Sequence, residues 1–295
     1  MIFFGCVLAL SSCYKHQSVG QKGERDIPEN QSDSILKCNG FSELCDRRPD
    51  ELTILMTHNS YNTKRDKFKF PNQYYSVYKQ LSDGVRGLML DVYSTSKGLM
   101  LYHGYSILGK KTLASVLTEI KNFLEENPDE VITIIFENHC SKAELSASLD
   151  KAGLSDMIYI HRGTWPTLRG MIESGKRLIL FVESDDNGNT EGILDAWQYI
   201  FDTRYSFSKI DAMDSQVNRG GHGTKTFFLL NHWITNRFGL AVRSVAEQAN
   251  SRDVLSERIN KSYNEHQKKI NFLGVDFYHI GDGLSVIDSL NGVIR

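Results

Sequence analysis

Three apolar runs of the sequence end on polar side chains that can take part in catalysis. The first run leads into His58 and Asn59, the second ends at Asp91, and the third ends at Glu137. A short alternating segment after the second run carries His103. Histidine transfers protons near neutral pH, whereas carboxylate and amide oxygens bind hard cations. These residue types therefore predict an enzyme with acid–base chemistry.

The elements that must position these side chains are predicted by the apolar pattern. Near-continuous apolar strands separated by helical patterns indicate a parallel sheet buried on both faces. Strands are expected at 52–58, 85–91, 131–137, 157–160, 177–183, 226–231 and 271–277, with a weak eighth at 199–201. Helices are expected at 74–82, 112–126, 142–152, 166–174 and 237–263. Polar residues at the carboxyl ends of such strands predict the α/β class and a (β/α)8 barrel.

Length and charge limit the alternatives. With 295 residues and 40% hydrophobic content, the chain can bury one large core, so we expect one main domain. A formal net charge of -2 gives no long-range attraction for nucleic acid. We therefore expect no nucleic-acid partner and a monomer, and any basic groups that matter must be local.

The amino-terminal segment predicts export. Residues 2–10 are apolar but too short to span a bilayer, and small residues then precede Cys13. Residues 1–13 resemble a bacterial lipoprotein signal with Cys13 as the lipid site, although Lys or Arg is missing before the apolar stretch. The alternatives are a buried amino-terminal strand or a secreted protein without an anchor. Residues 14–37 predict a polar tether, and 38–295 a single catalytic domain.

Cysteine usage agrees with export. Cys38 and Cys45 flank a short loop that a disulfide could close, which would contribute roughly 2 to 3 kcal/mol in the chain-entropy model. In a cytosolic protein the same pair would remain thiols. Cys140 is expected to be a free, small buried hydrophobe.

Several motifs resemble the catalytic X region of phosphatidylinositol-specific phospholipases C, over about residues 50 to 145. They are Thr57-His58-Asn59-Ser60-Tyr61, Gln80-Leu81-Ser82-Asp83-Gly84-Val85-Arg86, Tyr102-His103-Gly104 and Phe136-Glu137-Asn138-His139-Cys140-Ser141. Downstream, Leu230-Asn231-His232 and Val275-Asp276-Phe277-Tyr278 are more loosely similar to secreted bacterial and fungal members of the wider superfamily. The resemblance implies an irregular TIM barrel, of the PLC-like phosphodiesterase type, that cleaves the phosphodiester of an inositol phospholipid.

The resemblance also implies roles for both histidines. Phosphodiester cleavage by a neighbouring hydroxyl needs a base, an acid and positive charge on the non-bridging oxygens. We expect His58 to be the general base on the inositol 2-hydroxyl and His103 the general acid to the diacylglycerol oxygen. The expected partners are a phosphoinositide or related phospholipid and a membrane surface.

The sequence supports two different sources of positive charge for the phosphate, a bound calcium ion or a cationic side chain. In calcium-dependent members the corresponding ligand positions are occupied here by Asn59, Asp91 and Glu137. The fourth position is Met89, whose thioether is a poor ligand for a hard cation. Metal-independent bacterial members place an arginine where this sequence has Tyr93. We favour calcium held by three oxygen ligands plus waters and substrate, and a metal-independent mechanism stays open.

Headgroup contacts cannot be read from the motifs alone. The candidate substrate-binding residues are Arg86, Lys176, Arg219 and Asn231. One alternative function is a phosphodiesterase of the same superfamily that acts on another headgroup, such as a glycerophosphodiester or a sphingolipid. The other is a surface lipoprotein that binds inositol phosphates or glycans without turnover, and the pair of histidines argues against it.

Overall fold

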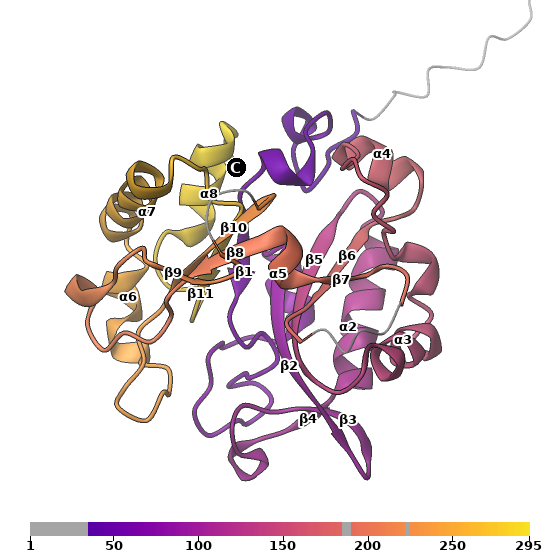
Figure 1. Ribbon diagram of the computed structural model, residues 1–295, viewed down its shortest axis with the longest axis horizontal. Helices are drawn as coiled ribbons and strands as arrows, with labels where there is room; N and C mark the ends of the chain where they lie inside the picture. The colour runs from indigo at the N-terminus through magenta and orange to yellow at the C-terminus, as the bar shows by residue number, and fades with distance from the viewer. Residues whose placement is uncertain (1–34, 185–189, 222–224) are drawn as a thin grey trace, which may run out of the picture. The chain divides into compact units, whose positions relative to one another are not determined.

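The strands form one curled sheet. The computed structural model describes residues 35–184, 190–221 and 225–295. Within them the sheet order is β7-β6-β5-β2-β1-β11-β10-β8-β9, and β3 and β4 extend β2 (Figure 1). The strands are β1 Ile54–Thr57, β2 Gly87–Thr95, β3 Gly98–Leu101, β4 Lys111–Thr112, β5 Ile132–His139, β6 Leu178–Val182, β7 Ile193–Asp195, β8 Ile200–Thr203, β9 Val217–Arg219, β10 Phe227–His232 and β11 Phe272–Val275. All neighbours from β7 to β8 in this order pair in parallel, whereas β9 pairs with β8 antiparallel.

Helices flank the sheet on both sides of Figure 1, with α2, α3 and α4 to the right and α6, α7 and α8 to the left. Their bounds are α1 Val77–Ser82, α2 Leu113–Glu126, α3 Lys142–Lys151, α4 Leu168–Glu173, α5 Ala196–Tyr199, α6 Ala246–Ala249, α7 Arg252–His266 and α8 Gly283–Asn291. Helix α2 shows why the sequence folds this way, because Thr112 accepts the N–H of Ser115 and caps its first turn. Its buried positions Val116, Ile120 and Phe123 recur every three or four residues along one face.

Alternation along the strands creates two cores. On β2, Leu88 and Leu90 belong to the outer core under the helices, whereas Met89 belongs to the inner core that the sheet encloses. On β5, Ile134 lies in the outer core and Ile135 in the inner core. Because side chains two residues apart share a face, the residues that follow Met89 and Ile135 at that spacing also point inward. The apolar pattern thus places the carboxylates of Asp91 and Glu137 at the mouth of the space that the sheet encloses.

The barrel is irregular because its sheet does not close. In the described residues no ladder joins β7 at one end of the sheet to β8 and β9 at the other. The expected strand 157–160 is wrong as a full strand, since only Ile158 forms an isolated bridge, to Leu178 of β6. Aromatic rings occupy this opening: Trp165 contacts Phe227 of β10 and Tyr199, which directly precedes β8.

The long helix expected at 237–263 is also wrong in its first half. The carboxamide oxygen of Asn236 accepts the backbone N–H groups of Phe238 and Leu240, and Gly239 adopts a φ of 74°. This turn prevents helix formation until α6 and α7. The preceding helices at 112–126, 142–152 and 166–174 agree with α2, α3 and α4 within two residues at each end.

The amino-terminal part of the described chain packs against the inner core. Cys38 and Cys45 form the expected disulfide, and both lie in the inner core with Leu44 and Leu52. The signal segment, Cys13 and the tether up to residue 34 lie outside the described residues. Among the helices of residues 35–295 that the structure describes, none is long and apolar enough to cross a membrane.

Candidate active site

A cavity of about 280 Å³ opens at the carboxyl ends of the strands. His58, directly after β1, and His103, two residues after β3, line it together with Asp91 of β2 and Glu137 of β5. Arg219, the last residue of β9, lines the same cavity. The structure therefore brings six of the nine residues proposed from the sequence to one place: these five, and Asn59, the neighbour of His58, which is described below.

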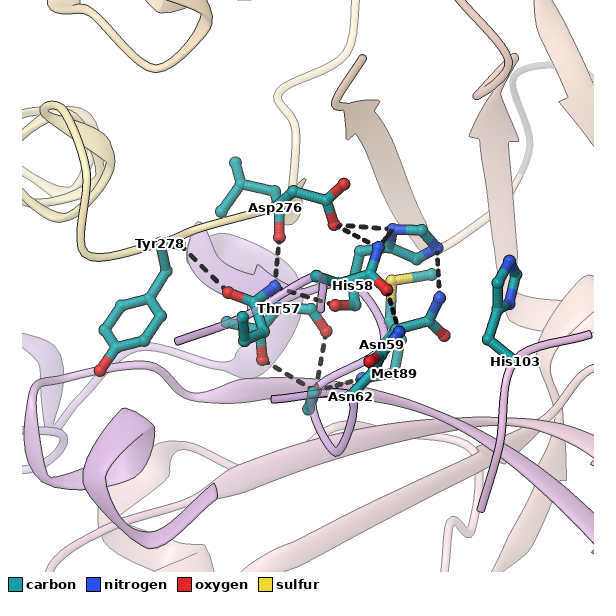
Figure 2. A network of polar contacts seen from close by, with 12 residues as sticks. Thr57, His58, Asn59, Asn62, Met89, His103, Asp276 and Tyr278 are labelled. Carbon is teal, nitrogen blue, oxygen red and sulfur yellow. Dashed lines mark hydrogen bonds and ion pairs between the residues drawn. The ribbon is translucent and has the colours of Figure 1, made fainter. Parts of the chain in front are cut away.

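His58 is held by a carboxylate from a distant strand. Its Nδ1 lies 2.9 Å from Oδ1 of Asp276, which follows β11, the neighbour of β1 in the sheet. The carboxamide of Asn72 donates to the same Asp276 oxygen at 2.9 Å, and the His58 ring stacks on Trp233 with centroids 3.9 Å apart. When Nδ1–H is donated to Asp276, Nε2 carries the lone pair, so His58 is arranged as a base. Figure 2 shows His58 between Asp276 and Asn59.

His103 has its own carboxylate. Its Nδ1 lies 3.0 Å from Oδ2 of Asp91, and its ring centroid lies 6.3 Å from that of His58. The hydrogen bond to Asp91 raises the pKa of His103 above its usual value, against burial, and the charges of Asp91, Glu137 and Asp276 add to the rise. A raised pKa favours the protonated ring, so His103 is arranged as an acid.

Asn59 bridges the two histidine–carboxylate pairs. Its backbone has a φ of 46°, a left-handed conformation that asparagine tolerates better than most residues. With the amide nitrogen facing Asp91, Nδ2 lies 2.7 and 3.2 Å from the two Asp91 oxygens. Oδ1 lies 3.2 Å from Nε2 of His58, from which it can accept once that nitrogen has taken up a proton. The side chain therefore connects His58 to the carboxylate that holds His103.

The calcium expectation can be tested against the donors present. Asp91 and Glu137 are register partners on β2 and β5, but Asp91 already accepts from His103 and from the nitrogen, not the oxygen, of Asn59. Glu137 accepts from His139 at 3.0 Å. Across the described ranges no three His, Cys, Asp or Glu side chains converge on a point that would hold a metal ion. As arranged, the nitrogen of Asn59 rather than its oxygen faces Asp91, so calcium at these residues stays a prediction and we derive no step through a metal.

Tyr93 occupies the place where metal-independent relatives were expected to carry an arginine. Its ring stacks on Tyr102 with centroids 3.9 Å apart and on His139 at 4.2 Å. Burial and the charges of Asp91 and Glu137 raise its pKa to about 12, so the hydroxyl stays neutral. Tyr93 therefore supplies no positive charge.

Arg219 supplies a permanent cation to the cavity. Its Nη1 donates to Glu183 at 2.5 Å, its Nη2 donates to Asp202 at 2.6 Å, and its guanidinium lies 4.2 Å from the ring centroid of Trp197. Burial raises the pKa of Glu183 to about 8, although the charge of Arg219 opposes the shift. The ring of Tyr205, a further cavity residue, lies 5.2 Å from the guanidinium. This cluster offers donors, acceptors and an aromatic face to a polar ligand.

Three other sequence candidates lie away from the cavity lining. Asn231 is buried in β10, where its amide donates to Asp202 at 3.0 Å and to the Thr203 carbonyl. Arg86 and Lys176 precede β2 and β6, and they therefore lie at the amino ends of strands whose carboxyl ends form the site. Arg86 pairs with Glu130, and the Lys176 ammonium donates to the Asp156 carbonyl. Both expectations are corrected, because strand direction sends these cations to the opposite end of the sheet.

Sequence reasoning missed roles for four residues of the site. Asp276 and Glu183 do follow apolar runs, and that position was the available signal. Asp202 lies within β8, a strand of only four residues, and Trp233 carries no signal beyond its place after β10. Their contribution becomes visible only when the sheet brings distant segments together.

The curled, mostly parallel α/β barrel thus carries two histidine–carboxylate pairs at the carboxyl ends of its strands. The family model described as PI-PLC X 1 matches residues 44–291, so the chain belongs to the PI-PLC X family.

Curated relatives agree with this assignment. A PI-PLC X domain-containing protein 1 of Arthroderma benhamiae is 30% identical over 281 residues, which span 88% of this chain and 90% of that protein. A PI-PLC X domain-containing protein of Arabidopsis thaliana is 26% identical, and the match spans 83% of this chain and 63% of that protein. An uncharacterized secreted protein of Arthroderma benhamiae is 27% identical, with 86% of this chain and 63% of that protein covered.

The fold matches solved structures. The F249X mutant of phosphatidylinositol-specific phospholipase C from Staphylococcus aureus aligns with a TM-score of 0.56 and 15% identity, over 85% of this chain and 95% of that chain. At this identity the match shows the fold alone. The expected irregular TIM-barrel fold of the phospholipase C type is thereby confirmed.

Proposed function

We propose that the protein is a phospholipase C that cleaves a phosphatidylinositol-type lipid into diacylglycerol and an inositol phosphate. The observation that carries this proposal is the pair of histidines in one cavity, each held by its own carboxylate, with ring centroids 6.3 Å apart. That spacing leaves room for a phosphorus centre between a proton acceptor and a proton donor.

The reaction follows from the two environments. Nε2 of His58 removes the proton of the inositol 2-hydroxyl, and the oxygen attacks phosphorus. As that bond forms, the bond from phosphorus to the glycerol oxygen breaks, and protonated His103 donates its proton to this leaving group. Asp276 stabilises the His58 imidazolium, and Asp91 holds His103 in position. The first products are therefore diacylglycerol and a 1,2-cyclic inositol phosphate.

Positive charge for the phosphate is assigned to Arg219 in this proposal. Asp91 and Glu137 add negative charge to the cavity lining, which raises the barrier for an anionic substrate unless a cation opposes it. Arg219 has both a fixed charge and a fork geometry suited to phosphate or polyol oxygens. Calcium stays a prediction, which activity in the presence of a chelator tests.

The deciding experiment is a small phospholipid panel with phosphorus NMR of the products. Cleavage of phosphatidylinositol with transient cyclic phosphate supports the proposal. A substrate that lacks the 2-hydroxyl should be inert, because the intramolecular nucleophile is gone. Equal cleavage of that substrate, or preference for a glycerophosphodiester or sphingolipid, would assign the protein to the second candidate function. Tight binding without turnover would leave the surface-binding alternative.

Export is part of the proposal. The Cys38–Cys45 disulfide is typical of an oxidising compartment, and one relative is named a secreted protein. Lipid attachment at Cys13 is proposed from the sequence alone. Fatty-acid labelling of the protein in cells, with Cys13→Ala as the control, tests the anchor: label on the variant contradicts it.

A further inference from the structure

The orientation of the His58 imidazole is not determined by its backbone. The backbone itself is held, because the N–H of His58 donates to the Val275 carbonyl at 3.0 Å and the His58 carbonyl accepts from the Gln73 side chain at 2.8 Å. The torsion about the bond to the ring stays soft, since histidine has no sharply preferred value for it. Contacts of the ring must therefore fix its orientation.

The partners of the two ring nitrogens leave one motion open. Nδ1 of His58 lies 2.9 Å from Asp276, and Nε2 lies 3.2 Å from the side chain of Asn59. A half-turn of the ring would place carbon where Nδ1 meets Asp276, so this hydrogen bond excludes it. A tilt of the ring plane would keep both partners within reach, because hydrogen bonds weaken steeply only at strongly bent angles. These two contacts alone would let the ring rock.

Trp233 removes this tilt. Its indole stacks on the His58 ring with centroids 3.9 Å apart and an angle of 10° between the two planes. Trp233 is only 4% exposed and belongs to the inner core together with Leu229 and Phe272, so neighbouring side chains hold the indole in place. A fixed, flat indole against one face of the imidazole defines the plane in which Nε2 lies.

Gly274 leaves the space in which the indole lies. It comes two residues after Phe272 of the inner core, on the inward-facing side of β11, and is the register partner of Asn231 on β10. A Cβ at Gly274 would lie 3.1 Å from Cζ3 of Trp233, which is closer than side chains normally pack. Its φ is not positive, so the backbone conformation does not require glycine here. The close approach of the indole does.

We propose that Trp233 is a positioning residue for His58, and that Gly274 is needed because a larger residue would displace the indole. This inference rests on the proposed function, since it gives Trp233 a part in the same reaction. The stack keeps Nε2 directed at the attacking hydroxyl, and a misplacement of about 1 Å at a reacting group costs on the order of 100-fold in rate. The indole face also stabilises the imidazolium that forms when His58 takes up the proton.

Steady-state kinetics on a water-soluble phosphatidylinositol analogue separate positioning from substrate binding. Trp233→Leu stays apolar but loses the flat face, so it should lower kcat roughly ten-fold or more with little change in KM. Gly274→Ala should lower kcat in the same way by a smaller factor, although it alters neither ring. Trp233→Phe keeps an aromatic face and should retain more activity than Trp233→Leu.

Three kinetic results would overturn the positioning role. Wild-type kcat in Trp233→Leu would show that the stack is dispensable. A raised KM with unchanged kcat would show that Trp233 binds substrate instead. Equal losses in Trp233→Phe and Trp233→Leu would show that the aromatic face is not the cause.

Two matched controls lie outside the site. Trp165→Leu removes an indole that is 6% exposed from the opening of the sheet, and Gly283→Ala places a Cβ 3.3 Å from the core residue Leu55. Both should keep the wild-type kcat and KM, once urea unfolding has shown that every variant is folded. Equal losses of kcat in the controls and in the Trp233 and Gly274 variants would mean general loosening of the fold and would contradict the proposal.

Proton NMR of the histidine rings tests the stack without any turnover. The ring current of an indole shields protons above its face, so the His58 ring protons should resonate upfield, and His58→Gln identifies their signal. At the same pH, Trp233→Leu should move this signal downfield and Gly274→Ala should shift it. Trp165→Leu should leave it in place and move the signal of His161, which stacks on Trp165 with centroids 4.4 Å apart.

The NMR outcome is independent of the proposed function. An unshielded His58 signal in the wild-type protein, or one that Trp233→Leu does not move, would overturn the stack and the role built on it. If the wild-type protein cleaves no phospholipid, the proposed function fails, and the NMR result still decides whether Trp233 fixes the ring of His58.

Discussion

His232 offers a quantitative test of the fold beneath the active site. It is fully buried in β10, its Nε2 lies 2.8 Å from the Ala249 carbonyl, and its Nδ1 has no hydrogen-bond partner. Burial lowers the pKa of His232 to about 3, and the charge of Arg258 adds to the decrease. In the unfolded chain the same group has a pKa near 6.5. Between these two values the unfolded state binds a proton that the folded state excludes.

The size of the effect follows from linkage. The pKa of His232 is lower in the folded state than in the unfolded chain. The free energy of unfolding is therefore fully retained above about pH 6.5 and decreases as the pH falls toward 3. From pH 7 to pH 4.5 the loss extends over about 2 pH units at ~1.36 kcal/mol each, or roughly 3 kcal/mol. His232→Gln keeps a donor for the Ala249 carbonyl but does not titrate. It should therefore be less stable than the wild type at pH 7 and lose less stability on acidification.

Urea unfolding of both proteins at pH 7 and pH 4.5 measures the difference. At the lower pH the difference in unfolding free energy between wild type and variant should change by roughly 3 kcal/mol in favour of the variant. All other titrating groups are common to both proteins and cancel in this comparison. A gap that is the same at both pH values would refute the buried, neutral state of His232.

Three further predictions concern the site and the disulfide. His58→Ala or His103→Ala should lower turnover roughly 100-fold or more with folding intact, and the rate of the wild-type protein should show a bell-shaped dependence on pH. Near-normal activity of either variant on an inositol phospholipid would contradict the assignment. If calcium is used after all, chelation should abolish activity, calcium should restore it and Met89→Glu should tighten its affinity, whereas full activity in excess chelator rules calcium out. Reduction of Cys38–Cys45 should lower the free energy of unfolding by roughly 2 to 3 kcal/mol, measured against a Cys38→Ser, Cys45→Ser protein that should not respond to reductant.

The sequence predicted the long elements well because their patterns are local. Helix α2 begins at the cap Thr112 and repeats its apolar positions over fourteen residues, so both its type and its bounds were readable. Strands β7 and β8 have three and four residues, too few for a period to emerge. The sheet opens next to them, where side-chain packing rather than a backbone ladder determines the path of the chain.

The site residues that could be predicted from the sequence are those that directly follow an apolar run. His58, His103, Asp91 and Glu137 follow apolar runs, and all four line the cavity. The partner of each histidine was not predictable, since Asp276 reaches His58 only through the pairing of β1 with β11. The predictions for the cationic side chains Arg86 and Lys176 were wrong for a related reason, because a positive charge does not indicate which end of a strand it occupies. Of the three cationic candidates, only Arg219 lines the cavity.

The pairing of β1 with β11 also determines when the protein becomes competent during synthesis. His58 and its partner Asp276 are separated by 218 positions, so the ribosome releases the histidine long before the carboxylate exists. At typical translation rates of roughly 5 to 20 residues per second, that delay is on the order of ten seconds or more. Throughout it, the nascent chain lacks the group that orients its base. The histidine–carboxylate pair of His58 therefore stays incomplete until the sheet has been assembled through β11.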